Sequence, residues 1–303
     1  MDVTTRVTPF EVDLAGRDLT RIGDLVPAEA EAILDLAAEL KREPQPLARR
    51  KTLGLYFTKH STRTRTSFAV AMTQLGGASL QLQAEDMHLS RGESLGDTGR
   101  VLSGYLDAIA IRTGPQADVD AWAEAASVPV INALTDDEHP CQALADALTI
   151  WERLGGTNGV RIAWVGDGSN VSVSLARLAP MLGMEMVVAA PAGYEPGVDG
   201  VEVTRDAREA AAGAEVLVTD TWISMGQEDE RDQRLRDLEP YRLDSAVLDL
   251  ASRDAIVLHC LPAHPGEEIA ADVLYGPRSA VWDEAENRVH VQKALLALLL
   301  GAA

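Results

Sequence analysis

Short apolar runs alternate with amphipathic stretches along almost the whole chain. The runs have the length of buried strands, and the stretches carry apolar residues at helical spacing. Strands are predicted over 53–57, 78–82, 108–111, 128–131, 159–165, 187–189, 216–219 and 256–258. Helices are predicted over 27–41, 64–75, 98–105, 117–126, 173–182, 205–212 and 243–251. Strands separated by helices predict the α/β class, with parallel sheets flanked by helices.

The chain length predicts two domains, because 303 residues exceed the usual size of one. A helix over 139–154 bridges to a second run of alternating strands and helices. The last helix, 287–300, comes too late to build another layer, so we expect it to pack back on the first domain. The predicted domains are residues 1–137 plus 286–303, and residues 138–285. We expect the active site in the cleft between them.

The charge balance excludes two classes of partner. A net charge of −20, from 47 acidic and 27 basic residues, argues against binding nucleic acid or an anionic membrane. Because acidic residues dominate the polar positions and only four of the basic residues are lysines, we also expect adaptation to a high-salt, halophilic cytosol. A generally acidic protein of a mesophile is the alternative interpretation. Two cysteines, the lack of a signal-peptide pattern and an apolar tract of only seven residues, 294–300, predict a cytoplasmic protein.

The most informative segment, residues 57–68, places hydroxyls and guanidiniums between a predicted strand and a predicted helix. Ser61, Thr62 and Thr64 offer hydroxyl donors, and Arg63 can bind phosphate oxygens with two hydrogen bonds. A helix N-terminus adds free backbone N–H groups and positive potential. The segment therefore predicts a phosphate site, although an ordinary capped surface helix has the same composition.

Two further places in the first part of the chain suit a reacting carbonyl group. Arg112 ends a predicted strand and is suited to stabilising a developing oxyanion. His139 and Gln142 open the bridging helix, and from there they can donate to a carbonyl oxygen and hold an amide. A solvated arginine and a structural histidine remain the alternative interpretations.

Polar residues also follow the predicted strands of the second domain. Asp220 supplies a carboxylate for an ammonium group, while Asn170, Ser224 and Cys260 supply further polar contacts. The carboxyl ends of parallel strands are where open α/β sheets bind ligands. These residues predict a pocket for a zwitterionic amino acid.

Two cofactor interpretations are disfavoured. The segment 166–170 resembles a dinucleotide-binding turn, but Val171 stands where a third glycine is needed. The histidines and cysteines lack the usual spacing of zinc ligands; they are His139, Cys141, His259, Cys260 and His264. We predict no cofactor and no metal.

Taken together, the motifs resemble the aspartate/ornithine carbamoyltransferase superfamily, specifically its ornithine branch. Ser61-Thr-Arg-Thr64 is similar to the family's carbamoyl-phosphate motif, and His139-Pro-Cys-Gln142 is similar to its second motif. The segments 220–226 and 259–262 are similar to the loops that distinguish ornithine users from aspartate users. The resemblance covers nearly the whole chain. It departs at Ser169, where a second asparagine is common, and at Val173, where a polar residue is frequent.

The resemblance implies transfer of a carbamoyl group from carbamoyl phosphate to L-ornithine, giving L-citrulline and phosphate in arginine metabolism. The implied carbamoyl-phosphate residues are Ser61, Thr62, Arg63, Thr64, His88, Arg112, His139, Gln142 and Arg288. The implied ornithine residues are Asn170, Asp220, Ser224, Met225, Cys260 and Leu261, and the implied catalytic residues are Arg112, His139 and Cys260. His88 corresponds to an element that reaches a neighbouring subunit, so a homotrimer is expected.

Three alternatives stay open at this point. A paralogous carbamoyltransferase for putrescine or a modified ornithine would keep the phosphate site and change the second loop. An α/β protein without enzymatic activity could bind an anion or an amino acid with the same residues. Cys260 could act as a covalent nucleophile, which a trapped thioester would reveal.

Overall fold

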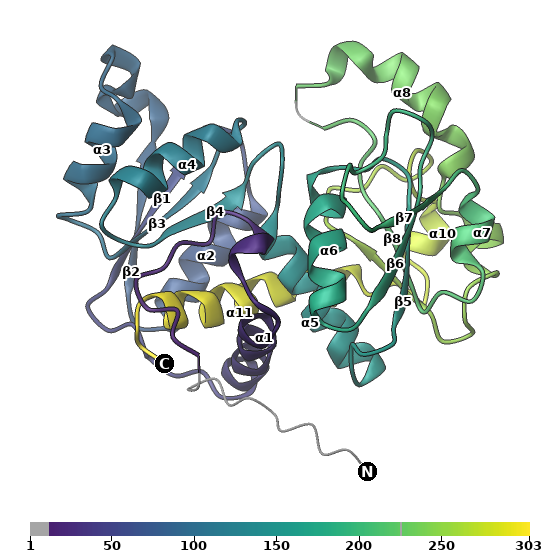
Figure 1. Ribbon diagram of the computed structural model, residues 1–303, viewed down its shortest axis with the longest axis horizontal. Helices are drawn as coiled ribbons and strands as arrows, with labels where there is room; N and C mark the ends of the chain where they lie inside the picture. Colours follow the sequence, from purple (N-terminus) through teal and green to yellow (C-terminus); the bar gives the residue numbers. More distant parts are fainter. Residues whose placement is uncertain (1–11, 225) are drawn as a thin grey trace. The chain divides into compact units, whose positions relative to one another are not determined.

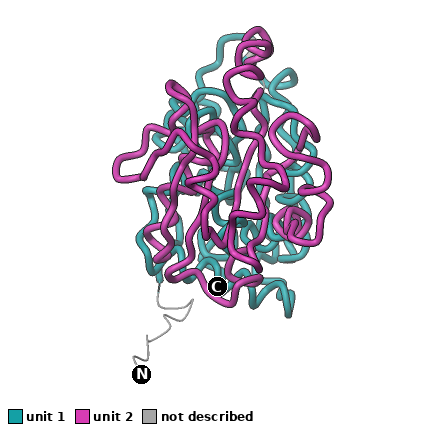
Figure 2. Tube along the Cα trace, turned by 90° about the vertical axis from the view of Figure 1, so that its right-hand side faces the viewer, with its two compact units in different colours: residues 1–148, 287–303 teal, residues 149–286 magenta. Residues whose placement is uncertain are grey.

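The computed structural model describes residues 12–224 and 226–303, and it divides into two compact units (Figure 2). Unit 1 is Met1–Leu148 with Asn287–Ala303, and unit 2 is Thr149–Glu286. Helix α5 (Pro140–Leu154) runs through the division, so its first half, with His139 just before it, belongs to unit 1. The domain boundary predicted at 137/138 and the predicted cleft stay predictions.

Unit 1 contains a parallel four-stranded sheet in the order β2-β1-β3-β4 (Figure 1). Its strands are β1 (Thr52–Phe57), β2 (Ala78–Gln83), β3 (Ala108–Arg112) and β4 (Val130–Leu134). Its helices are α1 (Pro27–Arg42), α2 (Arg63–Gln74), α3 (Leu95–Leu102), α4 (Gln116–Ala125) and most of α11 (Val281–Leu299). Trp122 of α4 is fully buried and packs against Tyr56 of β1, so this helix covers one face of the sheet.

Unit 2 contains a parallel five-stranded sheet in the order β7-β6-β5-β8-β9. Its strands are β5 (Arg161–Val165), β6 (Glu185–Ala189), β7 (Glu202–Thr204), β8 (Val216–Thr219) and β9 (Ile256–His259). Its helices are α6 (Asn170–Met181), α7 (Ala207–Ala211), α8 (Arg231–Leu238), α9 (Ser245–Leu248) and α10 (Ala271–Leu274). The predicted class, two α/β domains with parallel sheets, is confirmed.

Three elements of unit 2 were not predicted, and one helix was predicted too short. Strand β7 has three residues and is largely exposed, and α10 has only four residues. Helix α8 is mostly charged and buries little besides Arg234 and Leu238, so it has no apolar stripe to recognise. Helix α11 begins at Val281 rather than at 287, because its first turns are acidic and hide the apolar pattern.

The strand order gives each sheet one point where successive connections run in opposite directions. In unit 1 this point lies between β1 and β3, whose last residues, Phe57 and Arg112, are paired. In unit 2 it lies between β5 and β8, with Trp164 paired to Val218. Ligands of open α/β sheets bind outside the carboxyl ends of such strands. The topology therefore marks one candidate site in each unit.

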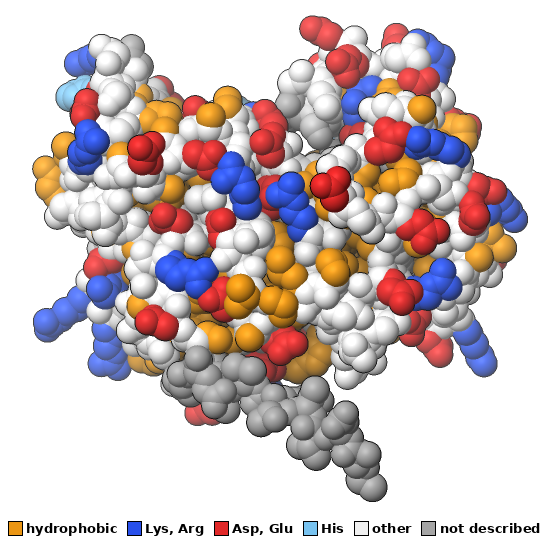
Figure 3. Space-filling view, in the orientation of Figure 1, with side chains coloured by type: hydrophobic (Ala, Val, Ile, Leu, Met, Phe, Trp, Pro, Cys, Tyr) orange, Lys and Arg blue, Asp and Glu red, His pale blue; other side chains and the backbone are white. Residues whose placement is uncertain are grey.

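The surface carries charges of both signs. On the face drawn in Figure 3, acidic and basic side chains are interspersed with apolar ones. Within the described part of the chain, the helices are too short or too polar for any of them to cross a membrane.

Candidate functional site

The loop after β1 leads directly into α2, as the sequence predicts. Thr62 is the N-cap residue of α2, and its side chain makes no capping hydrogen bond. The first backbone N–H groups of this twelve-residue helix are thus not covered by the side chain of Thr62. Ser61 is half-buried and Arg63 is exposed, so both can reach a ligand at the helix end. The arrangement suits an anion.

A chain of hydrogen bonds joins three helices of unit 1 at this place. Arg288 of α11 donates from Nη2 to Oγ1 of Thr64 at 3.1 Å and from Nη1 to Oε1 of Gln142 at 2.5 Å. Gln142 in turn donates from Nε2 to Oδ1 of Asp146 at 2.8 Å. Asp146 was not predicted, although it lies one turn after Gln142 on the same face of α5. Because a carboxylate only accepts, it directs the amide nitrogen of Gln142 toward itself.

The electrostatics around His139 bring further predicted residues together. His139 is almost completely buried, and its pKa lies well below the usual value. Burial is the largest cause, and the positive charges of Arg288, Arg112 and Arg63 add to it. The imidazole is therefore neutral at neutral pH. A neutral imidazole can donate one hydrogen bond to a carbonyl oxygen.

Arg112 lies at the end of β3, where the pairing register with β4 shifts. Its backbone carbonyl accepts the N–H of Thr58 at 3.0 Å, which fixes the loop after β1 to the end of β3. Arg112 is 9% exposed, so its guanidinium lies in a largely buried setting. A charge in such a place acts more strongly than one in water.

Two other residues of unit 1 behave differently. Cys141 is fully buried, which raises its pKa to about 11, and its thiol lies 3.7 Å from the carbonyl oxygen of Asn132. Its burial thus disfavours the thiolate form that a metal ligand needs. His88 is exposed on a short 3₁₀ helix, His88–Arg91, that follows β2. Its predicted contact with carbamoyl phosphate stays a prediction.

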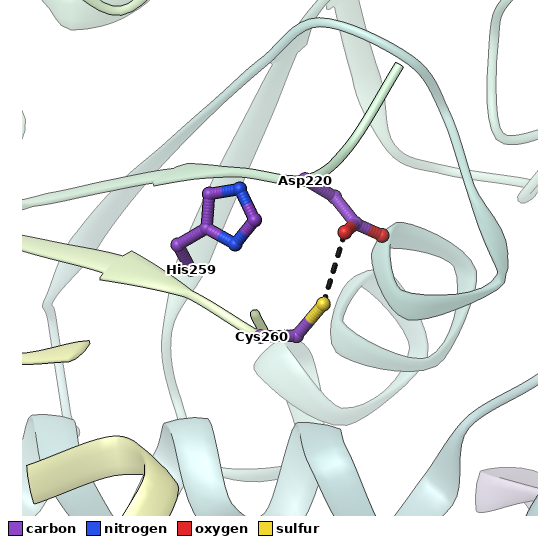
Figure 4. A group of neighbouring side chains, drawn as sticks. All are labelled: Asp220, His259 and Cys260. Carbon is purple, nitrogen blue, oxygen red and sulfur yellow. Dashed lines mark hydrogen bonds between the residues drawn. The ribbon is translucent and has the colours of Figure 1, made fainter. Parts of the chain in front are cut away.

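In unit 2 the carboxylate of Asp220 is the centre of a hydrogen-bonded cluster. Asp220 follows β8 and is 4% exposed. It accepts from Oγ of Ser169 at 2.8 Å, from Sγ of Cys260 at 2.9 Å and from the N–H of Thr221 at 2.7 Å. Figure 4 shows Asp220 and Cys260 meeting from the ends of neighbouring strands. Ser169, which departs from the family's common asparagine, thus holds this carboxylate in place.

A buried ion pair lies beside this cluster and was missed by the sequence analysis. Arg234 of α8 binds the carboxylate of Asp167 and donates from Nε to the carbonyl of Trp222 at 2.6 Å. Its guanidinium also lies 5.0 Å from the ring centre of Tyr194. Burial raises the pKa of Asp167 to about 6, and Arg234 only partly opposes this effect. The arginine therefore connects the loops that follow β5 and β8.

The remaining predicted residues of unit 2 lie on the same loops. Asn170 begins α6 and is half-buried. Ser224 is half-buried and donates its N–H to Oε1 of Gln227 at 3.0 Å. Leu261 follows Cys260 with a φ of 57°. Met225 lies outside the described residues.

Two groups in unit 2 have the composition of a metal site. Donor atoms of Asp220, His259 and Cys260 lie within 4.8 Å of one another (Figure 4), as do donor atoms of His264, Glu267 and Glu268. Hydrogen bonds within the protein explain why the three side chains of the first group lie close together. Cys260 donates to Asp220, and both ring nitrogens of His259 have partners. The absence of a metal stays a prediction.

The fold and the two clusters together define a class of protein. It is a two-domain α/β protein with a cationic, phosphate-type site at the strand ends of one unit and a carboxylate at those of the other.

Comparison with known families narrows this class. Residues 17–152 match the model "Aspartate/ornithine carbamoyltransferase, carbamoyl-P binding domain", and residues 158–299 match the corresponding "Asp/Orn binding domain". The chain belongs to the aspartate/ornithine carbamoyltransferase family. The resemblance that the motifs carry is confirmed.

Individual relatives agree with this assignment. An ornithine carbamoyltransferase of a Nostoc species is 50% identical over 302 residues, covering 95% of this chain and 99% of the relative. That of Carboxydothermus hydrogenoformans is 50% identical over 305 residues, covering 94% and 98%. The solved ornithine carbamoyltransferase of Pyrococcus furiosus is similar with a TM-score of 0.92 at 46% identity, covering 96% of this chain and 99% of that one.

Proposed function

We propose that the protein transfers the carbamoyl group of carbamoyl phosphate to L-ornithine, forming L-citrulline and phosphate. The observation that carries this proposal is the environment of His139. The positive charges of Arg63, Arg112 and Arg288 all act on this buried, neutral imidazole, which directly precedes α5. Such a site suits a phosphorylated carbonyl compound. The names of the relatives support the same reaction.

The phosphate end of the substrate binds at the start of α2. The backbone N–H groups and the hydroxyls of Ser61, Thr62 and Thr64 donate to its oxygens, and Arg63 balances its charge. Arg288 donates to Thr64 and so fixes that hydroxyl. This phosphate is the leaving group. Its negative charge grows as it departs, and the positive groups at the start of α2 stabilise that charge.

The carbamoyl end binds near Arg112, His139 and Gln142. Neutral His139 and cationic Arg112 donate to the carbamoyl oxygen, whose negative charge grows as the tetrahedral intermediate forms. A well-placed donor of this kind stabilises the transition state by about 3 kcal/mol. Gln142 binds the carbamoyl amide, with Asp146 and Arg288 fixing its orientation.

Ornithine binds to the cluster around Asp220. This carboxylate pairs with the α-ammonium, while the amide of Asn170 and the hydroxyl of Ser224 bind the α-carboxylate. Met225 is predicted to contact ornithine as well. The neutral δ-amine approaches past Cys260 and Leu261 and attacks the carbamoyl carbon. A C–N bond forms, the C–O bond to phosphate breaks, and phosphate leaves with the amine proton. Cys260 already donates its thiol hydrogen to Asp220, which favours a contact role over a covalent one.

The polar groups of Asn170 and Ser224 favour ornithine over putrescine, because putrescine has no α-carboxylate for them to bind. An ammonium group for Asp220 is present in both amines. A binding protein without activity would have no use for the polarising donors around His139. The experiment is an assay for citrulline with carbamoyl phosphate and a panel of amines in cytoplasm-like buffers. The proposal is supported if ornithine is carbamoylated to citrulline and the other amines of the panel are not carbamoylated. Carbamoyl-putrescine as the main product would assign the protein to the paralogous activity, and no product at all would contradict both.

We also propose that the protein is a cytoplasmic homotrimer acting in arginine metabolism. The face formed by α2 and the edge strand β2 carries a hollow of about 600 Å³, and exposed Leu80 and Val70 lie on these elements. An uncovered edge strand with apolar residues invites pairing. A second copy covering it would bring the segment with His88 to that copy. Light scattering tests this: a fully active monomer would contradict it.

A further inference from the structure

Two buried carboxylates, Glu268 and Glu284, support the loop after β9. Glu284 accepts the backbone N–H of His259 at 2.7 Å, and Oε1 of Glu268 lies 3.2 Å from Nε2 of the same histidine. Glu268 is 0% exposed and Glu284 is 1% exposed. Burying a carboxylate is costly unless hydrogen bonds compensate for the lost water. Neither residue belongs to the predicted substrate contacts, so substrate binding does not account for their burial.

The contacts of His259 select one form of its ring. Leu261 donates its backbone N–H to Nδ1 at 2.9 Å, so Nδ1 accepts and carries no proton. In a neutral imidazole the proton is then on Nε2, which faces Glu268. A doubly protonated ring would turn an N–H group toward the N–H of Leu261. The geometry therefore needs the neutral Nε2–H tautomer.

The backbone at Leu261 explains why this contact matters. Its φ of 57° is in the left-handed region, which a residue with a branched side chain rarely adopts. Such a conformation persists where the surroundings impose it. The hydrogen bond to His259 is one such constraint, and the thiol of Cys260 bonded to Asp220 is a second on the preceding residue.

We infer that Glu268 is a positioning residue for the amine-binding loop. It holds His259 as the Nε2–H tautomer, and His259 then holds Leu261 and Cys260. Glu268 also accepts the backbone N–H of His264, whose Nδ1 lies 3.3 Å from Oγ1 of Thr221 in the loop after β8. One carboxylate thus reaches both loops around Asp220. The inference rests on the proposed function, because it assigns this loop to the attacking amine.

The first test compares two changes at one position. Glu268→Ala removes the acceptor, and we expect kcat/KM for ornithine to fall by about 100-fold, the cost of a small misplacement. The KM for carbamoyl phosphate stays unchanged, because its contacts are elsewhere. Glu268→Gln keeps an oxygen acceptor of the same shape and should retain activity within about threefold of the wild type. The control is Glu267→Ala, which removes a neighbouring carboxylate paired with Arg231.

The second test separates the two nitrogens of His259. In His259→Asn the amide oxygen replaces Nδ1 and still accepts from Leu261, whereas in His259→Gln the amide reaches only toward Glu268. We expect the asparagine variant to be the more active. In the asparagine background, Glu268→Ala should cost less than in the wild type, since no tautomer remains to be fixed and only the contact with the N–H of His264 is lost. Equal and fully additive losses would contradict the inference.

The third test does not depend on turnover. Cys260 is half-buried and Cys141 is buried, so a thiol reagent reports on the loop with little background. Glu268→Ala should speed labelling of Cys260, while Glu268→Gln and Glu267→Ala should not. If the wild type forms no citrulline but the labelling rates follow this order, the proposed function fails and the positioning role stands. If citrulline forms and both labelling and ornithine kinetics are unchanged in Glu268→Ala, the inference is wrong.

Discussion

The two units have similar parallel sheets but carry side chains of opposite charge at the carboxyl ends of their strands. In each unit the predicted site lies at the carboxyl ends of the two neighbouring strands between which the direction of the strand connections reverses. In unit 1 the groups that gather there are Arg63, Arg112 and Arg288. In unit 2 the central group is the carboxylate of Asp220. Two sheets of similar topology thus carry groups of opposite charge at their carboxyl edges.

The buried titratable groups show the same contrast. The arginines of unit 1 add to burial in lowering the pKa of His139. In unit 2, burial and the nearby charge of Asp220 raise the pKa of Asp167, against the effect of Arg234. The cationic unit thus disfavours a further proton, and the anionic unit favours one. This contrast agrees with the proposal that each unit binds a group of the opposite charge.

Replacing a cation of unit 1 is expected to have the largest effect. Arg63→Ala should lower kcat/KM for carbamoyl phosphate by about 1,000-fold, because a charged donor to the leaving group is lost. Steady-state kinetics measure this. The control is Arg65→Ala, because Arg65 lies on the same helix as Arg63 and its guanidinium lies over the ring of Phe57 at the end of β1. Equal losses of kcat/KM in the two variants would contradict a specific role of Arg63 in binding the leaving group.

Replacing the anion of unit 2 should affect the other substrate. Asp220→Asn removes the charge that pairs with the α-ammonium, at a cost of about 2 kcal/mol, and should raise the KM for ornithine roughly 30-fold. The KM for carbamoyl phosphate should not change. Asp254→Asn, at an exposed position, is the matched control. A rise in the KM for both substrates would contradict the prediction that unit 1 binds carbamoyl phosphate and unit 2 binds ornithine.

The pH dependence of stability sharpens the comparison further. A carboxyl whose folded pKa, about 6, exceeds its unfolded value of 3.8 contributes stability at low pH that is lost as the pH rises through 6. Asp167→Asn removes this dependence, so its stability relative to the wild type should increase between pH 4 and pH 6 and then level off. Thermal unfolding across this range measures it. A constant difference would contradict the raised pKa.

Salt is expected to have the smallest effect. With a net charge of −20, the folded chain repels itself, and added KCl screens this repulsion. The melting temperature should rise modestly with salt, while carbamoyl phosphate binding at the cationic site weakens. Greatest stability in salt-free buffer would contradict the predicted halophilic adaptation.

The sequence predicts the strands and the residues at their ends well, for a physical reason. Buried parallel strands are short apolar runs, so the polar residue after each run, such as Arg112 or Asp220, is placed by the fold itself. The pair of Asp167 and Arg234 is different, because 67 residues separate its partners and α8 carries no apolar stripe. The tautomer of His259 likewise depends on contacts that no spacing reveals.

The contact between Arg288 and Thr64 has a consequence for how the protein is made. Its partners are 224 residues apart, and one of them lies in the last helix. Synthesis proceeds from the N-terminus, so the strands of unit 1 are made early, but they obtain this arginine only when α11 has been made. A chain that stops before α11 lacks that guanidinium altogether. Chains truncated before α11 should therefore bind carbamoyl phosphate poorly even where the strands of unit 1 have formed.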